Sequence, residues 1–447
     1  MATPKPASEP ASSARYDLTP VISEYLDLHL MFPLLEFVES NEHLNYDKSD
    51  IQRARLAYLK PTNMVDYAIE IFHDLNPEVK EDPADMVRQR DEVYEKLGRI
   101  KTEHTKLSTF FQEMREGKYA GGFGEGQSLS LRWIQENIGV DQAGVENYYR
   151  YGKFQYECGL YEDACTVLSD FLSIDEYKIT SSDLGFAALW GKFAALILQK
   201  QWDAALAEMQ TLKKAIDERT TPDKLQLQQR TWLLHWSLFV FFNHHQGRDL
   251  IIEAFLSDRY LQAIQINAPW LLRYLTSAVI INQRRRGELK ALVRVIEQEQ
   301  HSYSDPITKF LECLRVDFDF EGAQQKLVEC TNVLLGDYFL CNCTDEFVQS
   351  ARLFIFETYC RIHRKIDISM LAEKLVMEPE DAEQWIVNLI RGAQLDAKID
   401  SKDNCVIMGS SFPSVYQQIV DKTKDLTVRS FQLATNVERA TEAQAMM

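Results

Sequence analysis

The residues best suited to chemistry in this sequence form a cluster of cations. Arg284, Arg285 and Arg286 are consecutive, and Lys290 and Arg294 follow at a spacing that places both on one face of a helix. Guanidinium and ammonium groups in such a cluster bind phosphate, and binding of this kind weakens steeply with salt. The cluster predicts either an RNA or ribosome contact, or a solvated helix junction whose cations complement acidic residues.

No motif for catalysis or cofactor binding accompanies these cations. The sequence lacks a phosphate-binding glycine loop, an HExxH helix, a GxSxG turn and a paired-cysteine metal motif. His244 and His245 are adjacent, so we expect their rings to diverge at a polar helix end without sharing a metal ion. Cys341 and Cys343 have no second pair nearby, and we expect buried thiols. We therefore expect no enzyme activity, catalytic residue, cofactor or metal.

The composition describes a large acidic chain. Its 447 residues suggest several domains, and a net charge of −18 opposes general attraction to nucleic acid or an anionic membrane. The 8 cysteines have no regular spacing, which is typical of a reducing compartment. The longest apolar run, Trp232–Phe242, is far shorter than the ~20 residues that span a bilayer. We expect a cytoplasmic protein that does not enter a membrane.

Most of the chain is predicted to be helical, including the segments that position the cations. The segments Tyr151–Asp175 and Trp190–Asp217 match each other, and Asp317–Leu327 repeats the same turn. In each case an aromatic residue precedes an acid and, two positions after the acid, an alanine that lets two antiparallel helices pack closely. A period of about 40 residues with two helices per unit predicts an α-solenoid of the tetratricopeptide type, which offers a long surface to other proteins.

A heptad pattern precedes the repeats. It predicts one long helix from Pro83 to Glu116, with one apolar residue every seven positions and a second seam that contains Leu97 and Phe111. Two interpretations fit this pattern. The seam could pack inside its own domain, or Leu97 and Phe111 could form part of an interface with a partner.

The segment 351–409 predicts a winged helix. An amphipathic helix, a short strand and two further helices precede a pair of strands, Ala397–Asp400 and Cys405–Met408. The segment carries 8 basic and 10 acidic residues, and the third helix begins with acids where a helix in the major groove needs Arg or Asn. We therefore expect this winged helix to bind protein.

Two surfaces near the C-terminus are candidates for partner contacts. The wing strands are expected to leave a free sheet edge at which a neighbouring strand could pair, with Lys398, Ile399 and Val406 in the interface. A helix from Ser414 to about Arg439 carries an apolar stripe too long for the small winged helix to bury. Its members recur every seven residues, at Ile419, Leu426 and Leu433.

An α-solenoid that leads into a protein-binding winged helix resembles the PCI family, the scaffold subunits of the proteasome lid, the signalosome and translation initiation factor 3. Blocks such as "HLMFPLLEFVE", "YGKFQYECG", "ARLFIFETYCRIH" and "EQWIVNLIRGAQLDAKIDSK" resemble the initiation factor 3 members and extend from Tyr16 to about Lys402. The resemblance implies a non-catalytic scaffold beside the c, l and d subunits of that factor, which supports recruitment of the small ribosomal subunit and mRNA. A lid or signalosome scaffold and a direct RNA reader are the alternatives.

The expected fold is all-α dominated: a tetratricopeptide-like α-solenoid, a winged helix with a small β-sheet (together the PCI domain) and a C-terminal helix. The predicted divisions are a disordered tail (1–15), N-terminal helices (16–117), a Gly-rich linker (118–128), helical repeats (129–224), a PCI domain (225–409, with a helical part 225–345 and the winged helix 351–409) and a C-terminal helix and tail (410–447).

Overall fold

The chain forms two compact units, Met1–Phe354 and Ile355–Met447. The structure is a computed structural model, and it describes residues 16–41, 43–44, 46–79, 81–103, 105–116, 129–177, 182–219, 221–282, 287–363, 365–368, 384, 387, 397–400, 405–408 and 415–445. The predicted fold class is confirmed, since helices dominate the first unit and a small antiparallel sheet lies in the second.

The first unit begins with a layer of four helices, α1 (Thr19–Ser23), α2 (Met31–Ser40), α3 (Lys48–Leu59) and α4 (Val65–Leu75). The carboxylate of Asp47 accepts a hydrogen bond from the backbone N–H of Ser49, which caps the start of α3. Helices α2 and α3 pack against each other, and so do α3 and α4. Their shared apolar side chains, among them Leu34, Leu59 and Ile71, are buried.

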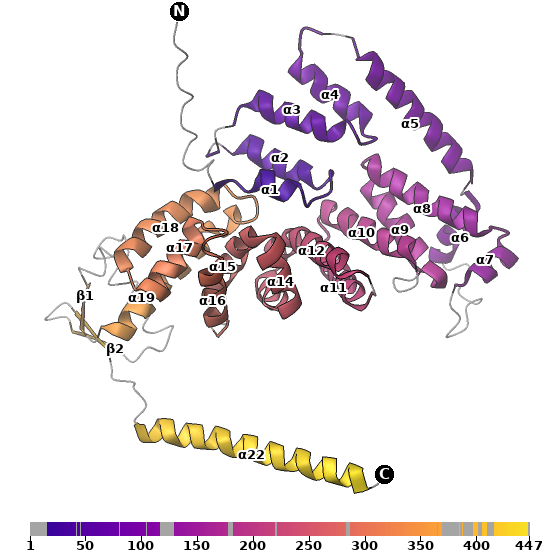
Figure 1. Ribbon diagram of the computed structural model, residues 1–447. Coiled ribbons are helices and arrows are strands. Elements are labelled where there is room, and N and C mark those ends of the chain that lie inside the picture. Colours follow the sequence, from indigo (N-terminus) through magenta and orange to yellow (C-terminus); the bar gives the residue numbers. More distant parts are fainter. Residues whose placement is uncertain are drawn as a thin grey trace, which may run out of the picture. The chain divides into compact units, whose positions relative to one another are not determined.

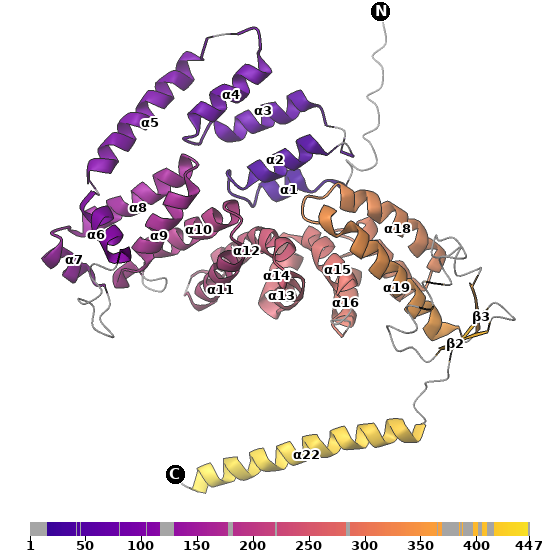
Figure 2. The same cartoon turned by 180° about the vertical axis from the view of Figure 1, so that it is seen from behind.

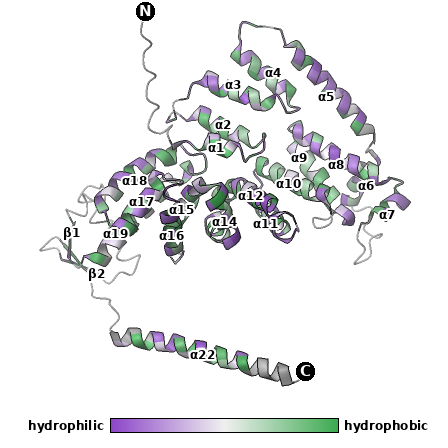
Figure 3. Cartoon of the chain, in the orientation of Figure 1, coloured by the Kyte–Doolittle hydropathy of each residue, from purple (hydrophilic) through white to green (hydrophobic). Residues whose placement is uncertain are grey.

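The region predicted as a single long helix, Pro83–Glu116, is described as two helices, α5 (Ala84–Glu103) and α6 (Thr105–Arg115), and residue 104 between them lies outside the described residues. Figures 1 and 2 show them as separate helices. No side chain over residues 84–100 is fully buried, and α5 is mostly hydrophilic in Figure 3. In α6, by contrast, adjacent aromatic rings enter a core cluster with α8 and α9. The heptad pattern therefore extends over two helices with different environments.

The predicted repeats are two helical hairpins, α8 (Gln142–Glu157) with α9 (Tyr161–Leu172), and α10 (Asp183–Leu198) with α11 (Trp202–Glu218). The turns of both hairpins contain a residue with left-handed backbone, Gly159 (φ 85°) and Lys200 (φ 59°), two positions before the aromatic residue. Phe318 (φ 53°) occupies the same place in the third predicted turn. The alanines that follow these turns are fully buried, as close helix packing requires: Ala164, Ala205 and Ala323.

Figures 1 and 2 also show the remaining helices of the first unit. They are α7 (Leu131–Asn137), α12 (Asp223–Asn243), α13 (Gly247–Phe255), α14 (Asp258–Asn267), α15 (Leu272–Ile281), α16 (Leu289–Glu299), α17 (Pro306–Glu312) and α18 (Phe320–Leu335). Helix α12 contacts α11, α13 and α14, so its C-terminal half is buried on almost every side. Among the helices described, none is long and apolar enough to cross a membrane.

The N-terminal segment, residues 16–41, is joined to helices far along the chain. The indole N–H of Trp236 donates to the backbone carbonyl of Tyr25 (3.0 Å). The amide of Asn41 donates to the carbonyl of Leu335 (2.7 Å). These bonds tie α1 and α2 to α12 and α18, so the N-terminal segment holds together parts of the unit that the chain order separates.

A buried network of charged groups joins the N-terminal segment to the later helices at a third place. Arg273 lies 1% exposed on α15, where its Nε is 2.7 Å from Asp305 Oδ2 and its Nη1 is 3.2 Å from Asp337 Oδ2. Its Nη2 donates to the carbonyl of Tyr16 (2.9 Å), and the hydroxyl of Tyr274 donates to Asp337 (2.9 Å). The cation is thus fully paired, as a buried charge requires.

The second unit contains the sheet and the C-terminal helix. Strands β1 (Lys365–Asp367), β3 (Cys405–Met408) and β2 (Ala397–Asp400) lie in that order, and both pairings are antiparallel. Helix α19 (Thr344–Ile362) contains the border between the units, and α22 (Val415–Ala445) follows the sheet. The two helices predicted between β1 and β2 lie outside the described residues, apart from Gln384 and Val387, both helical.

Candidate interaction sites

The predicted seam of Leu97 and Phe111 does not form one surface. Phe111 is fully buried in a core cluster, where its ring stacks on that of Tyr148 (centroids 5.6 Å apart). The assignment of Phe111 to a partner interface is therefore wrong, because a ring enclosed by its own unit offers no area to a partner. Leu97 is half-buried on α5.

The cation cluster is described only in part. Arg284, Arg285 and Arg286 lie outside the described residues. Lys290 and Arg294 are exposed on α16, whose opposite face is buried. Neither side chain forms an ion pair with any residue that the structure describes. Their exposure fits both interpretations of the cluster, so the contact with RNA or the ribosome stays a prediction.

The sheet has a different edge from the one predicted. Val406 lies on β3, which is the central strand, and pairs with Ile366 of β1 and Ile399 of β2. Its side chain is fully buried. Val406 is therefore not at a free edge, because β1 pairs with the side of β3 that was expected to be free. Within the described residues β2 is an edge strand, and it carries Lys398 and Ile399. The side chain of Ile399 is half-buried.

Helix α22 presents apolar residues to solvent. Ile419 is 56% exposed, Leu426 62% and Leu433 68%. Further exposed apolar side chains along the same helix are Tyr416, Val420, Val428, Phe431 and Val437. In Figure 3 hydrophobic residues alternate with hydrophilic ones along the coloured part of α22. Helix α22 has 31 residues of mixed polarity, and so many exposed apolar side chains along one helix are typical of a surface for association.

A site that the sequence does not predict lies between the N-terminal segment and the repeats. Two cavities of about 360 and 330 Å³ share Asp27, Trp190 and Trp236 in their walls. Trp232 and Glu24 line the smaller cavity, and Glu157 lines the larger. We call the site lined by these six residues the tryptophan groove. Volumes of this size are typical of ligand sites, about 300–1,000 Å³.

The aromatic wall of the groove is fixed by packing. The rings of Trp190 and Trp236 meet edge to face, with centroids 4.8 Å apart and planes at 82°. Trp236 is held further by a stack on Phe193 and by its hydrogen bond to Tyr25. Both indoles are half-buried. Trp190 donates no hydrogen bond to the described residues. The groove therefore has rigid aromatic surface that is partly open to a ligand.

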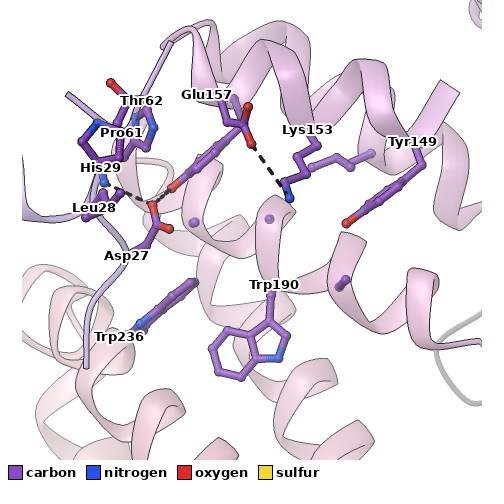
Figure 4. Close-up of a pocket in the computed structure, with 15 residues that line it drawn as sticks. Asp27, Leu28, His29, Pro61, Thr62, Tyr149, Lys153, Glu157, Trp190 and Trp236 are labelled. Atoms are coloured by element: carbon purple, nitrogen blue, oxygen red, sulfur yellow. Dashed lines mark hydrogen bonds and ion pairs between the residues drawn. The ribbon is translucent and has the colours of Figure 1, made fainter. Parts of the chain in front are cut away.

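The carboxylate of Asp27 faces this wall from the N-terminal segment. In Figure 4 it lies above the indole of Trp236, with Trp190, Glu157 and Lys153 farther along the cavity. Its Oδ2 accepts hydrogen bonds from the hydroxyl of Tyr156 (2.7 Å) and the backbone N–H of His29 (3.1 Å). Its Oδ1 accepts none from the described residues. One carboxylate oxygen thus orients the group, and the other remains available.

Burial governs the titration of the groups around Asp27. Burial lowers the pKa of His29 below its ordinary value, with partial opposition from the Asp27 charge. Burial, and secondly the Asp27 charge, raises the pKa of Tyr156. Tyr156 therefore remains a hydrogen-bond donor at neutral pH. Lys153 lies 3.9 Å from Glu157, which is longer than a hydrogen bond, so its ammonium leaves Glu157 largely accessible.

One cluster has the residue types of a metal site. Ligand atoms of Asp203, His244 and His245 lie within 4.8 Å of one another, closer than their sequence positions suggest. However, His244 Nδ1 accepts the backbone N–H of Gln246 (3.1 Å), so its Nε2 carries the proton donated to Asp203 (3.0 Å). A metal on Nε2 would displace that proton, and Lys200 lines the same cavity. The centroids of the His244 and His245 rings are 4.2 Å apart, so the prediction that the two rings diverge is wrong.

Fold and sequence together define the class of this protein. Helical hairpins that lead to a small three-stranded sheet are the architecture of a PCI protein, and residues 327–410 match the family model "PCI domain". Residues 17–155 match the model "eIF3 subunit 6 N terminal domain". The chain belongs to the family of the E subunits of eukaryotic translation initiation factor 3.

The relatives that show this cover nearly the whole chain. The E subunit of eukaryotic translation initiation factor 3 from Arabidopsis thaliana is 42% identical, over 97% of this chain and 99% of the relative. The protein of that name from Bombyx mori is 45% identical, over 97% of each chain. The one from Aspergillus fumigatus is 42% identical, over 97% of this chain and 96% of the relative.

Proposed function

We propose that this chain is a non-catalytic scaffold subunit of translation initiation factor 3 in the cytoplasm. The observation that carries the proposal is an identity of 42–45% over 97% of the chain to proteins named as the E subunit of that factor. The same observation favours this factor over the proteasome lid or the signalosome. The helical hairpins support a scaffold role, because stacked helix pairs offer extended surfaces for protein partners.

Helix α22 is the surface best suited to hold a neighbouring subunit. Its stripe of Ile419, Leu426 and Leu433 repeats every seven residues, the spacing that buries a seam against other helices. Helix association would bury these exposed side chains. Each fully buried Leu or Ile would contribute about 1.5–3 kcal/mol relative to its exposed state. The stripe would therefore contribute most of the affinity at this contact.

The edge strand β2 supplies a second contact for a neighbour. Its backbone groups on the side away from β3 could pair with a strand of another PCI subunit, and Lys398 and Ile399 would help to select the partner. The c, l and d subunits of the factor are the proposed neighbours. Lys290 and Arg294 would add a weak contact to RNA or to the small ribosomal subunit, which lets the scaffold support mRNA recruitment.

Mass spectrometry of proteins that copurify with a tagged full-length chain tests this function. We expect the subunits of initiation factor 3 in near-equal amounts, together with small-subunit ribosomal proteins at low salt. Recovery of lid or signalosome subunits in near-equal amounts, without initiation factor subunits, would overturn the proposal.

Substitutions in α22 test its proposed role. Leu426→Glu with Leu433→Glu should lower copurification of neighbouring subunits at least tenfold, since about 1.4 kcal/mol corresponds to a factor of ten. Thr427→Glu with Gln432→Glu is the matched control, because it adds the same charge at exposed polar positions of the helix. Equal copurification by both double variants would remove α22 from the interface.

A further inference from the structure

We propose that the tryptophan groove binds an arginine side chain from a basic segment of a partner protein. The charge of the site selects a cation. Glu24, Asp27 and Glu157 contribute three carboxylates to its walls, and Lys153 is the one cationic residue in the lining of the two cavities. A phosphate would be repelled by these carboxylates, so the groove does not suit RNA.

The aromatic wall favours a guanidinium over a compact ammonium. Trp190, Trp232 and Trp236 line the groove. Arginine is planar and weakly hydrated, so it can stack on an indole while its N–H groups bond a carboxylate in the same plane. Asp27 Oδ1 has no hydrogen-bond donor among the described residues and is the acceptor for this contact. The groove thus offers both surfaces that an arginine uses.

Glu157 supplies a second acceptor at the opposite wall. Its Oε2 accepts a hydrogen bond from the amide of Asn63 (2.8 Å), and its Oε1 is 3.9 Å from the ammonium of Lys153. Lys153 is exposed and makes no closer ion pair with the described residues. An entering guanidinium can therefore replace Lys153 beside Glu157 without breaking a hydrogen bond. The smaller cavity beside Trp232, of about 330 Å³, offers space for a neighbouring side chain of the segment.

Fluorine NMR of the full chain labelled with 5-fluorotryptophan tests this inference directly. The probe is N-acetyl-arginine amide, and N-acetyl-citrulline amide is its neutral control of nearly the same shape. We expect the arginine probe to shift the Trp190 and Trp236 resonances saturably, with a Kd on the order of millimolar for so small a ligand. The resonance of Trp133, on α7 outside the groove, should not move. The resonances are assigned from Trp→Phe variants.

Asp27→Asn provides the decisive variant. The amide oxygen can still accept the bonds from Tyr156 and His29, while the amide nitrogen removes the acceptor that faces the ligand. We expect the affinity for the arginine probe to fall about tenfold. Asp258→Asn is the matched control, since it makes the same charge change at an exposed position of α14. This control should leave the affinity unchanged.

Several results would overturn the inference. Equal shifts from arginine and citrulline would show that the charge is not recognised. An equal loss of affinity in Asp27→Asn and Asp258→Asn would show that only the overall charge of the protein matters. Shifts from uridine monophosphate but not from the arginine probe would assign the groove to nucleotides. If Asp27→Asn does not fold, two other measurements test the inference. They are the affinity of Glu157→Gln for the arginine probe and the comparison of the two probes on the unaltered chain.

Discussion

Acid should destabilise this protein through His235, a fully buried side chain on α12. Its ring stacks on Tyr25 of the N-terminal segment (centroids 4.4 Å apart, planes at 6°). The indole N–H of Trp270 donates to Nε2 (3.0 Å), so the proton of the neutral ring is on Nδ1 and is donated to the carbonyl of Thr231 (2.7 Å). A second proton on Nε2 would break the bond from Trp270, because an indole can only donate.

The magnitude follows from the shift in pKa. Burial lowers the pKa of His235 from 6.5 to about 4, and the hydrogen bond to Thr231 opposes the shift only in part. Between these values the unfolded chain binds a proton that the folded chain does not. The stabilisation is therefore complete above pH 6.5 and is lost as the pH falls toward 4. At about 1.36 kcal/mol per pH unit, a change from pH 7.5 to pH 5.0 should remove about 2 kcal/mol through this residue.

Urea unfolding followed by circular dichroism at pH 7.5 and pH 5.0 measures the effect. His235→Gln cannot titrate, so its free energy of unfolding should fall by about 2 kcal/mol less than that of the unaltered chain between the two pH values. Other groups, including His29, are present in both proteins and cancel in the comparison. His301→Gln, at an exposed position, should behave as the unaltered chain. The same pH dependence in His235→Gln and the unaltered chain would refute this reasoning.

Two further substitutions test how the first unit is held together. Arg273→Met leaves Asp305 and Asp337 buried without their cation and should lower the free energy of unfolding in urea by about 3–5 kcal/mol; Arg259→Met, at an exposed position, should change it by less than about 0.5 kcal/mol. A cost below about 1 kcal/mol for Arg273→Met would contradict the importance of the network. Ala205→Leu overpacks the second repeat turn and should cost about 1–3 kcal/mol in the same assay. The exposed neighbour in Ala204→Leu should cost far less, and equal costs would contradict close packing at this turn.

The sequence was most informative where a local pattern determines the structure. The repeat turns could be predicted because an aromatic residue, an acid and an alanine recur at fixed spacing, and Ala164, Ala205 and Ala323 are indeed buried between helices. The wing strands were also predicted with the bounds that the structure shows, Ala397–Asp400 and Cys405–Met408. Both patterns depend on residues that are close in sequence.

Errors arose where distant residues decide the environment. Nothing in the order of three short strands indicates that Val406 lies on the central one, since that depends on the pairing of β3 with β1 as well as with β2. The environment of Phe111 depends on the helices that enclose it, and a heptad pattern cannot supply them. The tryptophan groove combines Asp27 with Trp190 and Trp236, and no local signal connects these positions.

The tie between Tyr16 and Arg273 has a consequence for biosynthesis. These two residues are 257 positions apart, so the N-terminal segment leaves the ribosome long before its partner exists. At about 5–20 residues per second, the delay is roughly 13–51 s. During that interval the N-terminal segment lacks its hydrogen-bond partner on α15, and its partner Leu335 on α18 is made later still. The native position of the N-terminal segment can therefore be completed only after translation has passed α18.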